Sequence, residues 1–303
     1  MPKPSMAPMC ILGALAFAAC ATAQATTPVD APKVSVPAKP SEPFALDLMG
    51  AAAQGGMMVG RTVPLAKVFL GDMVLQADAS GLFVIGFDRD AGPATSLRVI
   101  APSGAVIDRI LNIETRTYKQ TRVDGLPPAM VTPPPEVLAR IKADAERKGK
   151  GFASIAAGTG FTEPFLWPIA GRISSPWGAQ RVLNGELDRP HYGVDIAAPI
   201  GTPISAPADG VIAFAESDLY YEGGLVMIDH GQGLITLYLH MSELDVAPGQ
   251  KVKQGQVIGR VGNKGRTTGP HLCWRMKWRG QNLDPSLAVA AFGGPAAPLP
   301  LTQ

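Results

Sequence analysis

The sequence has few aromatic residues and no excess of charge of either sign. Aromatic side chains make up 6% of the 303 residues, and 27 lysines and arginines are balanced by 25 aspartates and glutamates. The resulting net charge of +2 gives no electrostatic reason to expect a nucleic acid or an anionic membrane as partner. A hydrophobic content of 46% excludes global disorder. The length suits two modest domains with tails.

Long helical periodicities are also scarce, whereas glycine (34 residues) and proline (29 residues) are common. This composition favours turn-rich β structure over a helical bundle. Residues 44–122 alternate short apolar runs with turn signals, and predict a small β-sandwich domain without histidine or cysteine. We expect a spacer or recognition role for this domain. Its expected strands are Val63–Leu70, Met73–Ala77, Leu82–Phe87, Ser96–Ile100 and Val106–Tyr118.

A long apolar run is missing at the N-terminus, where Met9–Ala21 is too short to span a bilayer comfortably. Lys3 precedes this run, and small residues ending in Ala23-Gln24-Ala25 follow it. The pattern predicts a signal peptide over residues 1–25 and an exported protein of the periplasm or cell envelope. A lipoprotein anchor at Cys20 is the alternative, which Phe17 disfavours.

Cysteine is rare, and the three cysteines cannot all pair with one another. Cleavage after residue 25 removes Cys10 and Cys20, so the mature chain keeps Cys273 alone. Exported thiols usually form disulfides. A single exported thiol therefore needs a specific explanation.

The remaining segments divide the chain further. Residues 26–43 form a proline-rich linker, and residues 123–163 form a second linker with a short helix predicted over Glu136–Lys148. Residues 164–290 form the second domain, again with a β pattern, and residues 291–303 form a C-terminal tail.

One stretch of the second domain also occurs in a different class of protein. Val246–Val261 alternates apolar and polar residues around two Gly-Gln turns, as biotin- or lipoyl-carrying domains do. Such carriers need a lysine at a hairpin tip, whereas Lys277 falls in the next expected strand. The carrier hypothesis is therefore disfavoured.

Residues that carry chemistry are concentrated in the second domain. All four histidines of the chain lie between His191 and His271, and Cys273 follows closely. Such a cluster points to metal or hydrolytic chemistry. His230, in the turn sequence Asp229-His230-Gly231, is expected at the surface and outside the site. For His240 the alternative is a packed core histidine.

The spacing of these residues favours strands over helices. His191 and Asp195 are four apart, but the flanking prolines make a helix improbable, and Gly193 permits a backbone bend that brings the two side chains together. His271 and Cys273 at i and i+2 share one face of a strand, about 6.6 Å apart at the backbone. His240, at the end of an apolar run, is expected to project from a neighbouring strand.

Three blocks of the second domain together resemble a known family. These are RPHYGVDIAAPIGTPISAPADGVI around His191, the run ending Tyr238-Leu239-His240, and Gly269-Pro270-His271-Leu272-Cys273. They resemble the signature blocks of the lysostaphin/LytM-type zinc endopeptidases, and the resemblance covers Phe165 to Val289. It implies an antiparallel β fold with a groove, similar to duplicated hybrid motifs. It also implies one zinc ion per chain and cleavage of peptide bonds in peptidoglycan.

Carried over residue by residue, the resemblance makes His191 and Asp195 metal ligands and makes His240 and His271 the catalytic histidines. It places a histidine ligand where this chain has Cys273. Cysteine is a good zinc ligand, at about 2.3 Å against about 2.0–2.1 Å for imidazole nitrogen. Its extra negative charge should weaken the metal as a Lewis acid and raise the pKa of a bound water, so activity is expected to be reduced.

Two functions remain open at this point. The first is a zinc metalloendopeptidase, expected to be a monomer, that acts on peptidoglycan peptides. The second is a catalytically weak or inactive LytM-like module that binds peptidoglycan or activates a separate cell-wall amidase. Retention of all four other site residues disfavours the second function, and Cys273 keeps it open.

Overall fold

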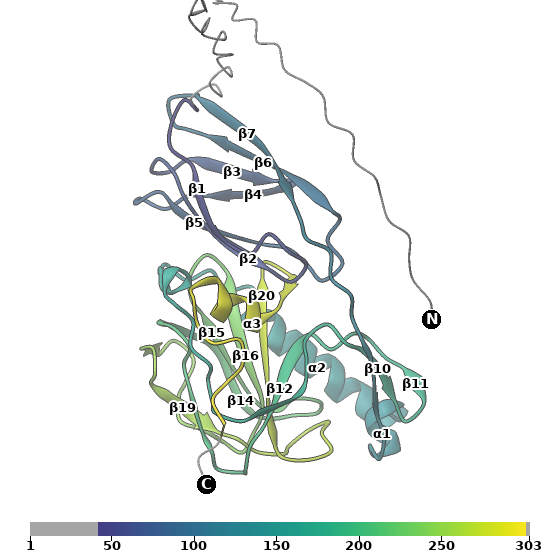
Figure 1. Ribbon diagram of the computed structural model, residues 1–303. Coiled ribbons are helices and arrows are strands. Elements are labelled where there is room, and N and C mark those ends of the chain that lie inside the picture. Colours follow the sequence, from purple (N-terminus) through teal and green to yellow (C-terminus); the bar gives the residue numbers. More distant parts are fainter. Residues whose placement is uncertain (1–41, 301–303) are drawn as a thin grey trace, which may run out of the picture. The chain divides into compact units, whose positions relative to one another are not determined.

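The computed structural model describes residues 42–300 (Figure 1). The predicted signal peptide, the alternative anchor at Cys20 and nearly all of the predicted linker 26–43 lie outside these residues. No helix within residues 42–300 is both long and apolar enough to cross a membrane. Strands dominate the described chain and helices are few, which confirms the predicted all-β class.

Residues 47–112 form two small antiparallel sheets. The first has the strand order β1-β2-β5 and the second β4-β3-β6-β7. Side chains alternate between buried and exposed along β6, where Leu97 and Val99 are buried. The bounds are β1 Asp47–Gly50, β2 Met57–Arg61, β3 Lys67–Leu70, β4 Met73–Gln76, β5 Leu82–Gly86, β6 Ala94–Ile100 and β7 Val106–Asn112.

Each of the five strands predicted in this region overlaps an observed strand. The strand predicted from Val63 begins only at Lys67, because Pro64 has no N–H for a ladder and Leu65 has a positive φ of 60°. The strand predicted to reach Tyr118 ends at Asn112. Strands β1 and β2 were not predicted, because their glycine and methionine residues give a weak β signal.

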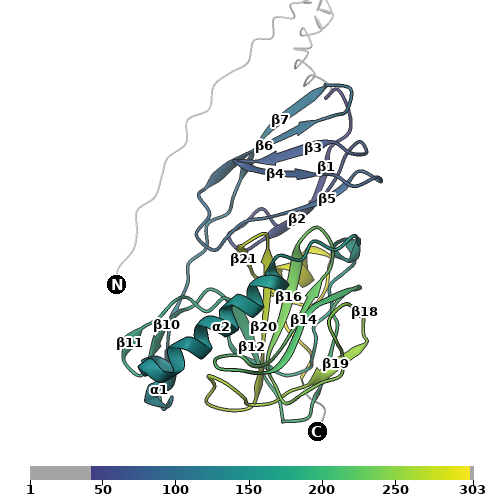
Figure 2. The same ribbon diagram turned by 180° about the vertical axis from the view of Figure 1, so that it is seen from behind.

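The segment between the two regions is attached to the C-terminal region. Helix α1 spans Pro128–Val131 and helix α2 spans Pro135–Phe152, longer than the predicted 136–148. Helix α2 lies against the strand β14, Gly210–Leu219, as Figure 2 shows, and its buried Asp144 accepts a hydrogen bond from the Tyr220 N–H at 2.7 Å. Strand β8, Gln120–Val123, pairs in parallel with β10, Gln180–Leu183, which the sequence patterns did not indicate.

The C-terminal region is built on an eight-stranded sheet of order β18-β14-β15-β16-β20-β12-β9, with β21 paired to β20. Every residue of β15 and β16 is buried, so these strands form the centre of the core. The further bounds are β9 Arg172–Ser175, β12 Gly193–Ala197, β15 Gly223–Asp229, β16 Leu234–Met241, β18 Lys251–Val252, β20 His271–Trp278 and β21 Gln281–Leu283.

Smaller elements complete this region. A three-stranded sheet has the order β13-β19-β17, and the helix α3 follows the last strand of the large sheet. Lys277 lies inside β20, as predicted, and not at a hairpin tip. The bounds are η1 Gly160–Thr162, β11 Glu186–Leu187, β13 Pro203–Ser205, β17 Glu243–Leu244, β19 Val257–Arg260 and α3 Pro285–Ala291.

One ion pair connects the N-terminal sheets with the C-terminal region. Arg116 follows β7, and its Nη2 lies 2.9 Å from Oδ2 of Asp284, whose side chain is 2% exposed. Asp284 also caps α3, because its Oδ1 accepts hydrogen bonds from the Ser286 N–H and hydroxyl. The carboxylate is thus satisfied on both oxygens.

Candidate metal centre and groove

The register of the large sheet brings the three sequence blocks to one place. Strand β20 lies between β12 and β16, so that Cys273 is directly opposite Asp195 on one side and opposite Leu239 on the other. His240 follows Leu239 directly, and His271 lies two residues before Cys273 on the same strand. The strand that was expected for His271 and Cys273 is therefore present, and a neighbouring strand presents His240.

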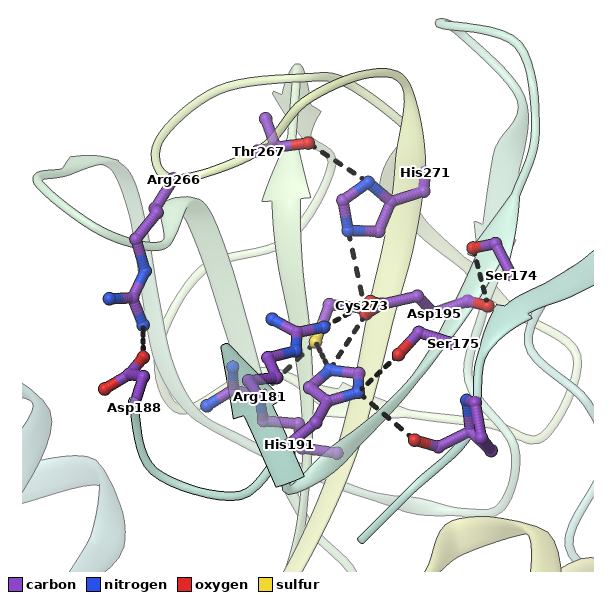
Figure 3. Close-up of polar contacts among 12 residues, drawn as sticks. Ser174, Ser175, Arg181, Asp188, His191, Asp195, Arg266, Thr267, His271 and Cys273 are labelled. Carbon is purple, nitrogen blue, oxygen red and sulfur yellow. Dashed lines mark hydrogen bonds and ion pairs between the residues drawn. The ribbon is translucent and has the colours of Figure 1, made fainter. Parts of the chain in front are cut away.

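Side chains of His191, Asp195 and Cys273 converge on one point (Figure 3). Their candidate ligand atoms all lie within 4.8 Å of one another, and all three residues are buried. His191 Nε2 lies 3.0 Å from Asp195 Oδ1 and 3.4 Å from Cys273 Sγ. This geometry can hold a metal ion.

The proton positions around these residues suit a cation at that point. His191 Nδ1 lies 3.2 Å from the Ser175 hydroxyl and 3.4 Å from the Pro176 carbonyl, which can only accept, so Nδ1 carries the proton. The Nε2 lone pair then faces Asp195 Oδ1, which is buried and has no hydrogen-bond partner among residues 42–300. Two lone pairs that face each other without a donor between them repel each other, and a cation bound between them removes this repulsion.

Burial and neighbouring charge determine the protonation of these groups. Burial by itself raises the pKa of Asp195, but the Arg181 guanidinium, 2.6 Å from Oδ2, outweighs this effect and holds that pKa below its usual value. Burial lowers the pKa of His191, so its ring is neutral. Burial raises the pKa of the Cys273 thiol to about 12. A metal ion bound to the sulfur would remove this proton.

His240 and His271 lie beside this cluster. His240 Nδ1 donates to the Lys264 carbonyl at 2.8 Å, and His271 Nδ1 donates to the Gly269 carbonyl at 2.9 Å. Both Nε2 atoms therefore keep their lone pairs, and His271 Nε2 lies 3.6 Å from Asp195 Oδ1. Burial, together with the neighbouring His271, lowers the pKa of His240 to about 3.

The backbone of His240 is strained. Its φ is +67°, in the left-handed region that a non-glycine residue rarely adopts. Such conformations cost of order 1–3 kcal/mol and gather at functional sites. His240 is buried, with 5% exposure, as the core-histidine alternative also expected, but it also lines the groove described below.

Gly193 has a different role from the one predicted. It begins the extended strand β12 and is absent from the residues with positive φ, so it supplies no unusual backbone bend. A Cβ at this position would meet Cys273 Sγ and Arg275 Cγ at 2.8 Å each. Gly193 therefore provides the space into which the sulfur and the arginine stem fit.

The prediction of an exposed His230 is wrong. Its side chain is fully buried, with Nδ1 at 2.8 Å from the Asp209 carbonyl and Nε2 at 2.7 Å from the Thr236 hydroxyl. The Phe165 ring packs against it edge-on. His230 lies outside the metal cluster, as expected, because it belongs to a hydrogen-bond network in the core.

Two arginines at the site were not predicted. Arg181, on β10, donates to Asp195 Oδ2 at 2.6 Å and leaves Oδ1 to the cluster (Figure 3). Arg275, on β20, donates its Nε–H to Cys273 Sγ at 3.4 Å. Arg275 lies two residues after Cys273, as Cys273 does after His271, so all three side chains share one strand face. This spacing could have predicted Arg275 from the sequence.

A groove gives access to the cluster. It has a volume of about 270 Å³, and its lining includes Asp195, His240, His271, Ser174, Val123 and Leu126. A second hollow of about 530 Å³ adjoins His191 and His240, and its lining includes Arg181, Arg189, Arg266, Arg275, Tyr192 and Tyr221. The cluster thus lies beside two hollows, and several cationic side chains line the larger one.

Comparison with known proteins finds similarity over this region. Residues 189–285 match the profile described as "Peptidase family M23". A DD-carboxypeptidase/endopeptidase Mpg from Neisseria meningitidis is 47% identical over 123 residues, which are 41% of this chain and 27% of the relative. The peptidoglycan DD-endopeptidase ShyA from Vibrio cholerae is 48% identical over 115 residues, 37% of this chain and 26% of the relative. The chain thus spans about a quarter of the length of these curated relatives.

A solved structure extends the similarity beyond this region. A Pseudomonas aeruginosa protein described as a candidate M23 peptidase shares 28% sequence identity with this chain at a TM-score of 0.61. The match covers 80% of this chain and 97% of that protein. It therefore includes much more than the segment that carries the site.

Proposed function

We propose, on the premise that the C-terminal part of the chain belongs to peptidase family M23, that this protein is a zinc-dependent endopeptidase that cleaves peptide bonds in peptidoglycan. The observation that carries the proposal is the convergence of His191, Asp195 and Cys273 beside two histidines with free Nε2 atoms. Three ligands and adjacent general bases are typical of catalytic zinc sites, whereas structural sites have four protein ligands.

His191 Nε2, Asp195 Oδ1 and Cys273 Sγ are the proposed ligands of one zinc ion per chain. The buried, unpartnered Asp195 Oδ1 supports this assignment, because a carboxylate oxygen without a donor is costly in the core. A zinc ion held there would supply Lewis-acid polarisation of a carbonyl and an acidic bound water.

His240 and His271 are the proposed catalytic residues. Each ring is fixed by its Nδ1–H bond to a backbone carbonyl, so Nε2 is the nitrogen available for chemistry. A free Nε2 can accept a proton from an attacking water, and the protonated ring can then donate it to the leaving amine. The second ring can hydrogen-bond to the developing oxyanion. Both roles need rings that do not rotate, which the carbonyl contacts provide.

The substrate is proposed from the relatives and the groove. One relative is named a peptidoglycan DD-endopeptidase, and the other a DD-carboxypeptidase/endopeptidase. Arg189 also lines the larger hollow and has no ion pair among residues 42–300, so its guanidinium suits a peptide with a free carboxylate, as peptidoglycan peptides have. We propose that the chain acts as an exported monomer in the periplasm or cell envelope, with residues 1–25 removed.

The domain boundaries at residues 44–122, 123–163 and 164–290 are likewise a proposal. Residues 157–159, between α2 and η1, are exposed. Limited proteolysis should cut there and release a stable C-terminal fragment. Preferred cleavage within residues 211–261 would contradict these boundaries.

The function is tested with purified residues 26–303. Zinc content is measured by elemental analysis, and purified cross-linked muropeptides are digested and analysed by mass spectrometry. We expect close to one zinc per chain and new free amino and carboxyl ends, with no products after chelation or in His271→Ala. Absence of both zinc and cleavage, with binding to peptidoglycan or stimulation of an amidase, would instead establish the non-catalytic module.

A further inference from the structure

Cys273 has a cationic neighbour on its own strand. Arg275 lies two residues further along β20, on the same strand face, and its Nε–H points to Cys273 Sγ at 3.4 Å. The missing side chain of Gly193 leaves room for both the sulfur and the arginine stem. The contact therefore lies within the large sheet, between β20 and its neighbour β12, and does not depend on a surface loop.

Arg275 is not held by a carboxylate. No Asp or Glu within residues 42–300 forms an ion pair with its guanidinium, and the nearby Glu222 is paired with Lys148. Among residues 42–300, the Cys273 sulfur is the hydrogen-bond partner of this side chain. A guanidinium kept beside a sulfur without a carboxylate partner suits a sulfur that becomes negatively charged.

The charges of the cluster match this arrangement. His191, Asp195 and Cys273 supply two anionic ligands to a divalent ion, one more than two histidines and an aspartate would. Each anionic ligand has one guanidinium: Arg181 on Asp195 Oδ2 at 2.6 Å, and Arg275 on Cys273 Sγ. Hydrogen bonds from residues behind the ligands orient those ligands and tune the metal, and their loss typically lowers metal affinity.

We infer that Arg275 is the positioning residue of Cys273, which holds the sulfur in the ligand position and offsets the charge that cysteine adds there. This inference rests on the proposed zinc site and deepens it. The substitution of cysteine for histidine and the presence of Arg275 then form one functional unit. Removal of Arg275 should weaken zinc binding when residue 273 is cysteine, and should have little or the opposite effect when it is histidine.

A double-mutant cycle tests this unit in the full mature chain. Zinc dissociation constants are measured by competition with a chromogenic chelator for the wild type, Arg275→Met, Cys273→His and the double variant. We expect Arg275→Met to weaken zinc binding about 10- to 100-fold in the wild type. In the Cys273→His chain, where the guanidinium faces a neutral ligand, we expect no loss or a tighter site.

The absorption spectrum of the cobalt-substituted protein is a second measurement. It would not change if Arg275 had a purely structural role. Arg275→Met should shift the thiolate-to-cobalt charge-transfer absorption of the wild type, because the sulfur loses its hydrogen-bond donor. Arg275→Lys, which keeps the charge, should restore part of the zinc affinity. Circular dichroism and the melting temperature of the metal-free proteins verify that each variant folds.

The outcomes separate this inference from the proposed function. Equal losses of zinc affinity in both backgrounds, or an unchanged cobalt spectrum, would overturn the role of Arg275, even if the wild type cleaves peptidoglycan. A rise in KM without a change in zinc affinity would likewise overturn it in favour of substrate binding. If the double-mutant cycle gives the expected zinc affinities but the wild type does not cleave peptidoglycan, the inference about Arg275 holds and the peptidase function is refuted.

Discussion

The rings of His240 and His271 lie with their centroids 4.7 Å apart and tilted by 52°, and each ring donates its Nδ1–H to a backbone carbonyl. They come from neighbouring antiparallel strands, β16 and β20, although 31 positions separate them along the chain. The pair therefore presents two Nε2 lone pairs beside the same buried cluster. This relationship is the structural basis for assigning the catalytic roles to these rings.

Loss of either ring should abolish most activity without loss of the metal. We expect His240→Ala and His271→Ala each to lower kcat about 10²- to 10⁴-fold, the range for removal of a general acid–base group. Zinc content and melting temperature should stay close to those of the wild type for His271→Ala. Loss of zinc from His271→Ala would show that His271 is a ligand and would contradict the assignment.

Changes at Cys273 should separate metal binding from catalysis. Cys273→Ser should lose zinc affinity, because a hydroxyl is a poor replacement for a thiolate ligand. Cys273→His should keep the metal and preserve or raise cleavage, because it removes one anionic ligand. Zinc content and muropeptide products are the two measurements. Wild-type zinc affinity in Cys273→Ser would remove the sulfur from the ligand set.

His230 should make the stability depend on pH. Burial lowers its pKa to about 4, against about 6.5 in an unfolded chain. Between these values the unfolded chain binds more protons, so stability is fully present above pH 6.5 and falls as the pH drops toward 4. The shift corresponds to a loss on the order of 3 kcal/mol.

Urea unfolding at pH 7 and pH 4.5 measures this effect. Other groups also titrate in this range, so the wild type is compared with His230→Asn. The variant should be less stable at pH 7, because the hydrogen bond between His230 and Thr236 is lost, but its stability should decline less between the two pH values. Identical declines in both proteins would show that His230 does not titrate as described.

The Arg116–Asp284 pair should stabilise the contact between the N-terminal sheets and the C-terminal region. Arg116→Met leaves the buried Asp284 without its cation, so we expect a loss of about 1–3 kcal/mol in unfolding free energy. Arg98→Met, at the exposed pair with Asp108, is the matched control and should have no measurable effect. Equal effects of the two substitutions would refute a special role for Arg116.

Local patterns in the sequence predicted much of the fold and most of the candidate site. His271 and Cys273 could be placed on one strand face because strand periodicity is a local property. The resemblance of the three blocks supplied the expected roles of Asp195 and His240, which periodicity alone does not contain. The roles of these residues stay predictions until variants are measured.

The features that were missed depend on residues far apart in the chain. The Asp229-His230-Gly231 sequence is a turn pattern, but the burial of His230 comes from Phe165 and from the Asp209 carbonyl. The parallel pairing of β8 with β10, which carries Arg181, joins segments 60 positions apart, from Gln120 to Gln180. Neither is encoded in a short window of sequence.

X-ray absorption at the zinc edge of the reduced, zinc-loaded wild-type protein tests the central claim most directly, because it reports the atoms bound to the metal. The account predicts one sulfur at about 2.3 Å together with nitrogen and oxygen neighbours at about 2.0–2.1 Å, with the sulfur lost in Cys273→His. A spectrum with nitrogen and oxygen neighbours alone, in a protein whose Cys273 is intact and reduced, would contradict it.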